Sequence, residues 1–216
     1  DMFSGAAIAY GEGNVGCTWD FMYNVDTAVM WGGNPSVSRI PDAHFVWEGK
    51  YNGAKIIVIT PEFNATAKSA DLWIPIKAGS DNILAMGVIN VILNEKLYKP
   101  EFMKTFTDLP FLVDVKTQKM IRRSEMEHAA NDEDHYKFEE EFYCMNKATG
   151  KVALMPGTEG SKIKSLRLDE QGIEPELEGT WTITDMHGDK RTVTTVFEML
   201  KKSAAKFAPE SIQEVT

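Results

Sequence analysis

Three short apolar runs lie in the first eighty residues, and each ends in a polar or glycine-rich loop. The runs cover residues 27–31, 55–59 and 72–76, and their length and flanking turn residues favour β-strands. Helical patterns follow them at 41–51, 64–70 and 81–95. A chain that alternates strand and helix forms a parallel sheet joined by right-handed crossovers. The expected fold class is therefore α/β, a Rossmann-like parallel sheet with flanking helices.

The loops after these runs outline a nucleotide-sized site, because open parallel sheets bind ligands beyond the carboxyl ends of their strands. Glycine leaves room for a ligand beside the backbone, and an asparagine amide both donates and accepts hydrogen bonds. Glu62 stands where doubly wound folds place an acceptor for ribose hydroxyls. The third loop opens a helix, so we expect free amides and the Ser80 hydroxyl to face the crevice. The loop residues are Gly32, Gly33 and Asn34, then Thr60, Pro61 and Glu62, then Gly79, Ser80 and Asp81.

The same loops have a plainer interpretation. Gly, Asn, Pro, Ser and Asp are common in turns for conformational reasons alone, and Asp81 is a suitable cap for the helix after it. The dinucleotide fingerprint G-x-G-x-x-G is absent after the first run, which argues against an ordinary NAD enzyme. Ligand binding and simple turn formation both stay open at this point.

Beyond Lys96 the alternation stops. The patterns predict a helix at 100–106, a strand at 111–115, a solvated loop or surface helix over the charged stretch 122–141, strands at 142–145 and 152–155, another strand pair around 186–189, and a helix at 193–206. We therefore expect three segments: a Rossmann-like nucleotide-binding segment over 1–109, a β-rich insertion over 110–191, and a helical return to the main body over 192–216.

Composition excludes several classes of protein. The net charge of -9 argues against nucleic acid as a partner, which needs a surplus of Lys and Arg. No apolar run approaches the length that crosses a bilayer, so we expect no direct membrane insertion. Two cysteines, Cys17 and Cys144, are too few for a disulfide framework or an iron–sulfur site. The chain begins at Asp1 without Met, and a short helix at Pro209 is followed at once by the last residue, so we expect a piece of a longer protein.

Other polar and aromatic groups have two interpretations. His44 and Glu48, four residues apart on a helix, are able to ligate a metal, but such a face is more often solvated. The same holds for His128 and His135 in the acidic stretch. Four aromatic residues are candidates for a substrate funnel, although core packing is their usual role. They are Trp19, Phe21, Tyr23 and Trp31.

Three segments between Gly11 and Asp81 resemble the catalytic subunit of molybdenum enzymes of the dimethyl sulfoxide reductase family. They read Trp-Gly-Gly-Asn-Pro-Ser-Val-Ser-Arg-Ile-Pro-Asp-Ala-His-Phe, Ile-Ile-Val-Ile-Thr-Pro-Glu-Phe and Asp-Leu-Trp-Ile-Pro-Ile-Lys-Ala-Gly-Ser-Asp. Within the family, Ser38-Arg39 followed by Pro41 to Phe45 resembles the nitrate reductase and nitrite oxidoreductase branch. The resemblance is strong over the first 115 residues and returns near Val193.

The resemblance implies a cofactor, bis(molybdopterin guanine dinucleotide) with molybdenum. It assigns one guanine dinucleotide to three loops, which are Trp31–Pro35 with Ser38 and Arg39, Thr60–Phe63 and Lys77–Asp81. In this branch an aspartate about ten residues before the Gly-Glu pair ligates molybdenum, and Asp1 stands ten before Gly11-Glu12. Asp1 is thus the implied catalytic residue and metal ligand, since a high-valent ion prefers hard oxygen donors. The alternative is a terminal residue with no role.

The implied activity is oxygen-atom transfer between nitrate and nitrite. One alternative is a molybdenum dehydrogenase or reductase acting on ethylbenzene, dimethylsulfide, selenate, chlorate or perchlorate; another is a non-catalytic nucleotide-binding module. The implied partners are the remainder of the catalytic subunit, which carries an iron–sulfur cluster outside this chain, an iron–sulfur electron-transfer subunit, a haem or membrane-anchor subunit, and a small anionic substrate. A respiratory membrane is the implied location, with its periplasmic or cytoplasmic face left open.

Overall fold

The computed structural model describes residues 4–10, 16, 18–156 and 168–213. The chain forms two compact units that divide between Asn82 and Ile83, here called the N-terminal and C-terminal units. The first holds a parallel sheet with helices and the second holds antiparallel sheets with helices, which confirms the expected α/β class. The division into three segments at 109 and 191 stays a prediction. Within the described ranges, no helix is long and apolar enough to span a bilayer.

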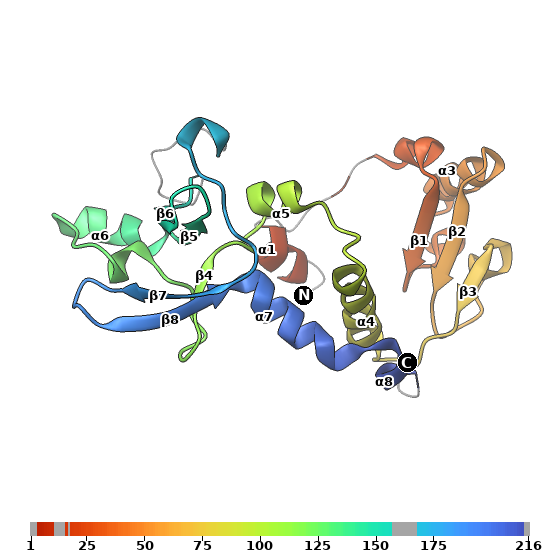
Figure 1. Ribbon diagram of the computed structural model, residues 1–216. Helices are drawn as coiled ribbons and strands as arrows, with labels where there is room; N and C mark the ends of the chain where they lie inside the picture. Colours follow the sequence, from red (N-terminus) through yellow and green to blue (C-terminus); the bar gives the residue numbers. More distant parts are fainter. Residues whose placement is uncertain (1–3, 11–15, 17, 157–167, 214–216) are drawn as a thin grey trace. The chain divides into compact units, whose positions relative to one another are not determined.

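The sheet of the N-terminal unit has the strand order β1-β2-β3, and both strand pairs are parallel (Figure 1). Its strands confirm the three predicted runs, although the third ends before Pro75, which has no N–H to continue the ladder. The predicted helix at 64–70 is only a 3-10 helix at Ala67–Ser69. The elements of this unit are α1 (Ser4–Tyr10), a 3-10 helix (Trp19–Asn24), β1 (Thr27–Trp31), α2 (Pro35–Ser38), α3 (Ile40–Tyr51), β2 (Lys55–Ile59) and β3 (Leu72–Ile74).

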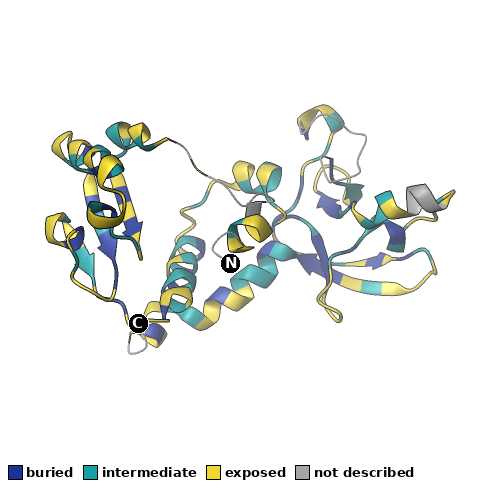
Figure 2. Ribbon diagram, turned by 180° about the vertical axis from the view of Figure 1, so that it is seen from behind, coloured by how far each residue is buried: buried dark blue, intermediate teal, exposed yellow. Residues whose placement is uncertain are grey.

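Alternate residues of β1 and β2 point into a small core. Ala28 and Met30 of β1 are buried together with Ile56 and Val58 of β2, and Val46 of α3 packs among them. Buried and exposed residues therefore alternate along β1, as expected for a strand with one covered face (Figure 2). This core joins α3 and the Trp19–Asn24 helix to the sheet, so it holds the strand ends in place.

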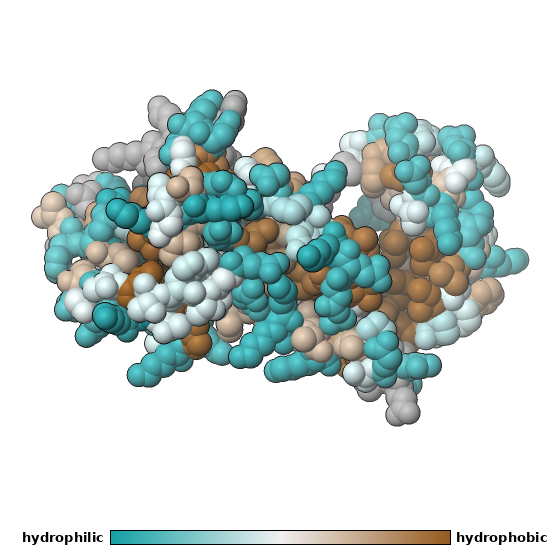
Figure 3. Space-filling model, in the orientation of Figure 1, coloured by the Kyte–Doolittle hydropathy of each residue, from teal (hydrophilic) through white to brown (hydrophobic). Residues whose placement is uncertain are grey.

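Apolar side chains also lie outside this core, at the intervening strand positions. Val29 and Leu72 are 51% and 43% exposed, and Trp31 is 40% exposed. Figure 3 shows hydrophobic residues gathered over the strands of this unit. Val29, Trp31 and Leu72 are thus large apolar residues of the described strands that the core does not cover.

The C-terminal unit contains a three-stranded antiparallel sheet of order β4-β8-β7 and a separate hairpin of β5 and β6. The hairpin confirms the strand pair expected on either side of a polar turn. The elements are α4 (Asp81–Asn94), which begins in the N-terminal unit, α5 (Pro100–Phe106), β4 (Leu112–Asp114), α6 (Asp132–Glu139), β5 (Tyr143–Asn146), β6 (Lys151–Leu154), β7 (Thr180–Thr184), β8 (Lys190–Thr195), α7 (Val196–Ala204) and α8 (Pro209–Ile212).

The helix predicted at 193–206 was wrong at its start. Residues Val193 to Thr195 complete β8 by pairing with β4, and α7 begins only at Val196. The Thr195 hydroxyl accepts a hydrogen bond from the backbone N–H of Glu198 and caps the helix. β-branched residues before a Thr-x-x-Glu capping signal explain why a strand runs directly into a helix here.

The charged stretch at 122–141 contains a helix, α6, as one form of the prediction had it, but the stretch is only partly solvated. Arg123 forms ion pairs with Glu127 at 2.8 Å and with Glu141 at 2.9 Å. The Glu141 side chain is 7% exposed, and the Arg123 guanidinium lies 3.9 Å from the ring centroid of Phe138. These ion pairs hold the segment against β5, where the Tyr143 hydroxyl donates to Glu127.

Candidate nucleotide-binding site

The first loop begins where β1 ends and turns sharply into α2. The Gly32 N–H donates to the carbonyl of Ile59 at 2.9 Å, and Gly32 has a φ of +66°, a conformation that favours glycine. A side chain built at Gly32 would meet no atom within 4 Å among the described residues. Asn34 then precedes α2, with its carbonyl accepting from the Ser38 hydroxyl at 2.9 Å. The loop thus presents open backbone at the carboxyl end of the strand.

The second loop continues as far as the 3-10 helix at Ala67–Ser69, and a side-chain hydrogen bond joins this continuation to the first loop. The Thr66 hydroxyl donates to Oδ1 of Asn34 at 2.8 Å, and Thr66 is fully buried. Pro61 and Glu62 are exposed, whereas Thr60 is buried, with its carbonyl accepting from the Trp73 indole at 3.0 Å. The sequence alone gave no role to Thr66. The sequence feature that could have indicated the position of Thr66 is Asn64, whose side chain accepts from the Thr66 and Ala67 N–H groups and forms an Asx turn.

The third loop is joined to the first as well. The Trp31 indole N–H donates to Oδ1 of Asp81 at 2.7 Å, across 50 positions of sequence. Gly79 has a φ of +87°, and no described atom would lie within 4 Å of a side chain there. Ser80 is buried, and its hydroxyl donates to the carbonyl of Lys77 at 2.7 Å. All three predicted loops therefore meet at one edge of the sheet.

A small pocket of about 200 Å³ opens at the first loop. Among its lining residues are Trp31, Gly33, Asn34, Ser38 and Arg39, all of which the sequence assigns to cofactor binding. Ligand pockets for drug-sized molecules are about 300–1,000 Å³, so this volume fits one part of a nucleotide. Residues of the other two loops do not line it, and their assignment as cofactor ligands stays a prediction. Asp1, the implied metal ligand, and Cys17 lie outside the described residues.

Charge at the site is mixed. The Arg39 guanidinium lies 3.5 Å from Asp42 and its side chain is 66% exposed, so water screens this pair. Glu62 is an exposed carboxylate on the second loop. Arg39 is therefore available to an anion, and Glu62 to hydroxyl donors.

The metal-ligand candidate on α3 is a hydrogen-bonded pair. His44 Nδ1 lies 3.2 Å from Glu48 Oε1, and the Tyr23 hydroxyl donates to Glu48 Oε2 at 2.7 Å. The hydrogen bond from Tyr23 lowers the pKa of Glu48, against a smaller opposing effect of desolvation. In the parts of the chain that the structure describes, no group of three or more His, Cys, Asp or Glu is placed to hold a metal ion. His135 has no described side chain.

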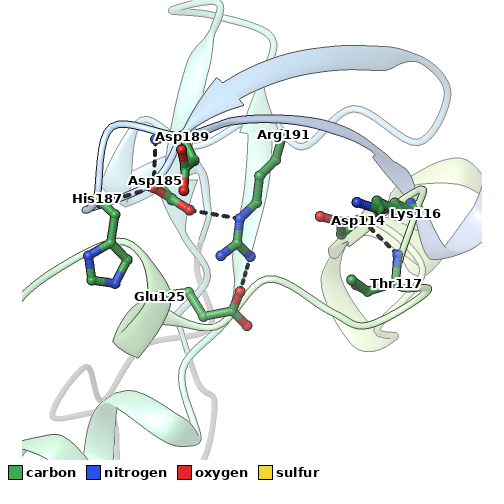
Figure 4. A network of polar contacts seen from close by, with 8 residues as sticks. All are labelled: Asp114, Lys116, Thr117, Glu125, Asp185, His187, Asp189 and Arg191. Atoms are coloured by element: carbon green, nitrogen blue, oxygen red, sulfur yellow. Dashed lines mark hydrogen bonds and ion pairs between the residues drawn. The ribbon is translucent and has the colours of Figure 1, made fainter.

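A second polar cluster lies in the C-terminal unit, at the turn between β7 and β8 (Figure 4). Asp185 accepts hydrogen bonds from the backbone N–H groups of His187 and Asp189 at 2.9 and 3.0 Å, and from Nε of Arg191 at 2.9 Å. Arg191 also pairs with Glu125. Asp114 builds the turn after β4 in the same manner, accepting from two backbone N–H groups. These carboxylates shape turns, and their acceptor capacity is used within the protein.

We expect Asp185 to make the stability of the C-terminal unit depend on pH. Burial raises its pKa, but hydrogen bonds from Asp189, His187 and Arg191 lower it more, so the net pKa lies below the ordinary 3.8. A lowered folded-state pKa gives stability that is complete above pH 3.8 and is lost as pH falls through the folded value. The stability difference between the wild type and Asp185→Asn, measured by chemical unfolding, should therefore be clear at pH 7 and should shrink as the pH falls further below 3.8.

The matched control for this experiment is Asp189→Asn, which removes an exposed carboxylate from the same turn but keeps the backbone N–H donor. In this variant the free energy of unfolding should change with pH as much as it does in the wild type. If the free energies of unfolding of the wild type and Asp185→Asn differed by the same amount at pH 7 and below pH 3.8, the prediction would be wrong.

Comparison with known proteins gives a consistent result. The sequence matches the family profile described as molybdopterin oxidoreductase over residues 4–200. It is 38% identical over its whole length to the alpha subunit of dimethylsulfide dehydrogenase from Rhodovulum sulfidophilum, and 37% to that of chlorate reductase from Ideonella dechloratans. It is 32% identical, also over its whole length, to the alpha subunit of respiratory nitrate reductase from Haloferax mediterranei. The chain spans 22% of the length of each of these relatives.

Proposed function

This chain belongs to the molybdopterin oxidoreductase family, and we therefore propose that it forms part of the catalytic subunit of a molybdenum oxidoreductase. In this proposal its three loops hold one guanine dinucleotide of bis(molybdopterin guanine dinucleotide). The observation that carries it is the joining of the loops, from Asn34 to Thr66 and from Trp31 to Asp81. Loops held together at the carboxyl edge of a parallel sheet are the usual position for a nucleotide.

The first two loops offer three different chemical groups to the nucleotide. Asn34 offers an amide at the pocket, Arg39 an exposed guanidinium suited to phosphate oxygens, and Glu62 an exposed acceptor suited to ribose hydroxyls. The open backbone at Gly32 and Gly79 admits close approach of a ligand. These groups fit a guanine dinucleotide, whose parts are a polar base, a ribose and a pyrophosphate. The remaining assigned residues, Gly33, Ser38, Thr60, Pro61, Ser80 and Asp81, shape the three loops.

When bound, the cofactor supplies a metal that accepts or donates an oxygen atom while electrons pass to iron–sulfur partners. The chain's own contribution is to bind and orient one arm of that cofactor. Asp1 is proposed as a carboxylate ligand of molybdenum, because hard oxygen donors suit such an ion. Because the pocket of about 200 Å³ is smaller than a nucleotide needs, we propose that this chain forms one wall of the site and that the rest of the catalytic subunit completes it.

Sequence identity to the relatives favours dimethylsulfide or chlorate over nitrate as the substrate of the parent enzyme. Identity is 38% and 37% to dimethylsulfide dehydrogenase and chlorate reductase, against 32% to nitrate reductase. We propose a sulfide or chlorate as substrate of the parent enzyme. Dye-coupled assays of that enzyme test this: oxidation of dimethylsulfide or reduction of chlorate should exceed reduction of nitrate, and faster turnover of nitrate would reverse the order.

Removal of the Arg39 charge should reduce cofactor binding by the parent enzyme. If Arg39 contacts phosphate, Arg39→Ala loses one exposed charge-assisted contact, and the guanine released per subunit should fall severalfold. Lys68→Ala removes an exposed cation outside the three loops and should keep the guanine content. Molybdenum and guanine are measured together after acid hydrolysis. Absence of both from the wild type would refute the proposed function, and bound guanine nucleotide without molybdenum would favour a non-catalytic module.

A further inference from the structure

Thr66 is the one buried hydroxyl in the described part of the chain that bridges the first and second loops. Its Oγ1 donates to Asn34 Oδ1 at 2.8 Å and accepts from the backbone N–H of Ser36 at 3.2 Å. The Ser36 N–H occupies one lone pair of the Thr66 oxygen, and among the described residues Asn34 is the acceptor that receives the hydroxyl proton. The Asn34 atom that it meets is therefore an acceptor, the amide oxygen. This pattern determines which way the Asn34 amide is turned.

The nitrogen of the Asn34 amide has no hydrogen-bond acceptor among the described residues. Asn34 Nδ2 carries two N–H donors, and no described residue accepts from either. The residue lines the pocket of about 200 Å³ at the first loop. An asparagine free to flip would present either its oxygen or its nitrogen to a ligand. With its oxygen engaged by Thr66, Asn34 presents only a donor.

Thr66 is itself held rigidly. Its N–H and that of Ala67 both donate to Oδ1 of Asn64 at 3.0 Å, and Ala67 lies in the core that joins α3 to the sheet. The hydroxyl position is therefore set by packed backbone rather than by a mobile loop. Its buried position also excludes water as a competing partner of the Thr66 hydroxyl.

We infer that Thr66 is a positioning residue that turns Asn34 so that its amide N–H donates to an acceptor oxygen of the bound nucleotide. The inference rests on the proposed function, because it assumes that a nucleotide occupies this pocket. Two oxygens have the required chemistry, a phosphate oxygen and the carbonyl oxygen of the base. Ligands that lack an acceptor at this point leave the Asn34 amide without a partner and bind more weakly.

The test uses the parent catalytic subunit prepared without its cofactor, and GDP as the probe. Thr66→Val keeps the shape of the side chain without the hydroxyl, and should raise the Kd for GDP about tenfold, which corresponds to one hydrogen bond of about 1.4 kcal/mol. Thr66→Ser restores the hydroxyl and should bind GDP within about twofold of the wild type. Asn34→Ala, at a surface loop, should weaken GDP binding by a similar factor.

The decisive comparison is the double variant. If Thr66 acts through Asn34, Thr66→Val adds nothing to the loss already caused by Asn34→Ala, whereas independent effects would multiply. Multiplying losses, or GDP binding by Asn34→Ala equal to that of the wild type, would overturn the inference. Wild-type protein that does not bind GDP would instead refute the proposed function. Inorganic pyrophosphate as a second probe separates the two oxygens: Thr66→Val weakens it only if the acceptor is a phosphate.

Discussion

Replacement of Phe197 by alanine should destabilise the C-terminal unit by about 3–5 kcal/mol, the range for large aromatic side chains removed from a core. Phe197 is fully buried at the start of α7, and its ring meets Tyr98 edge-on at a centroid distance of 5.4 Å. Leu93, Leu177 and Ala204 belong to the same cluster. Because these residues come from distant parts of the sequence, the cavity cannot close without moving α7. Chemical unfolding monitored by circular dichroism measures the change.

The control is Phe106→Ala, which removes the same side chain from a position that is 63% exposed on α5. We expect its effect to stay near about 0.5 kcal/mol, as for most surface substitutions. Similar losses for the two variants would show that Phe197 is not the centre of the core described above.

Gly49→Ala should destabilise the N-terminal unit by about 1–3 kcal/mol, the usual cost of overpacking. A Cβ at Gly49 would lie 2.5 Å from the carbonyl oxygen of Met22, a backbone atom that cannot rotate away. Alanine is otherwise favoured over glycine in a helix by about 1 kcal/mol, so the expected loss runs against helix propensity. Thermal unfolding of the protein gives the measurement.

Gly5→Ala is the matched control, since Gly5 also lies in a helix but no described atom would be within 4 Å of its new Cβ. This variant should be neutral or slightly more stable. If Gly49→Ala is as stable as Gly5→Ala, the close approach of α3 to the Trp19–Asn24 helix is not maintained in solution.

The fold of the N-terminal unit was largely predictable because its signals are local. Each strand appears as a short apolar run, and α3 has Pro41 in its first turn and Gly53 just past its end. The start of α7 was missed for the opposite reason. Val193 and Thr194 fit a strand or a helix by sequence, and only their pairing with β4 and β7 decides between the two.

The site was predictable only to the level of loops. That three strand ends gather at one edge follows from parallel topology. The bonds that join them do not, since Trp31 and Asp81 are 50 residues apart and Asn34 and Thr66 are 32 apart. Such contacts depend on the angle at which each loop leaves the sheet. The ion pairs of Arg123 have the same origin, because the sequence shows an excess of acidic residues around it but not which of them is buried.

The reactivity of the buried Cys144 thiol gives a measure of how often the C-terminal unit opens. Cys144 is fully buried in β5, and burial raises its pKa to about 12, so alkylating reagents find almost no thiolate while the unit is closed. In a protein whose other cysteine, Cys17, is replaced by serine, the labelling rate then measures how often β5 becomes accessible. We expect slow labelling of Cys144 in the native protein and fast labelling in Phe197→Ala, so that the labelling rate measures local unfolding around β5.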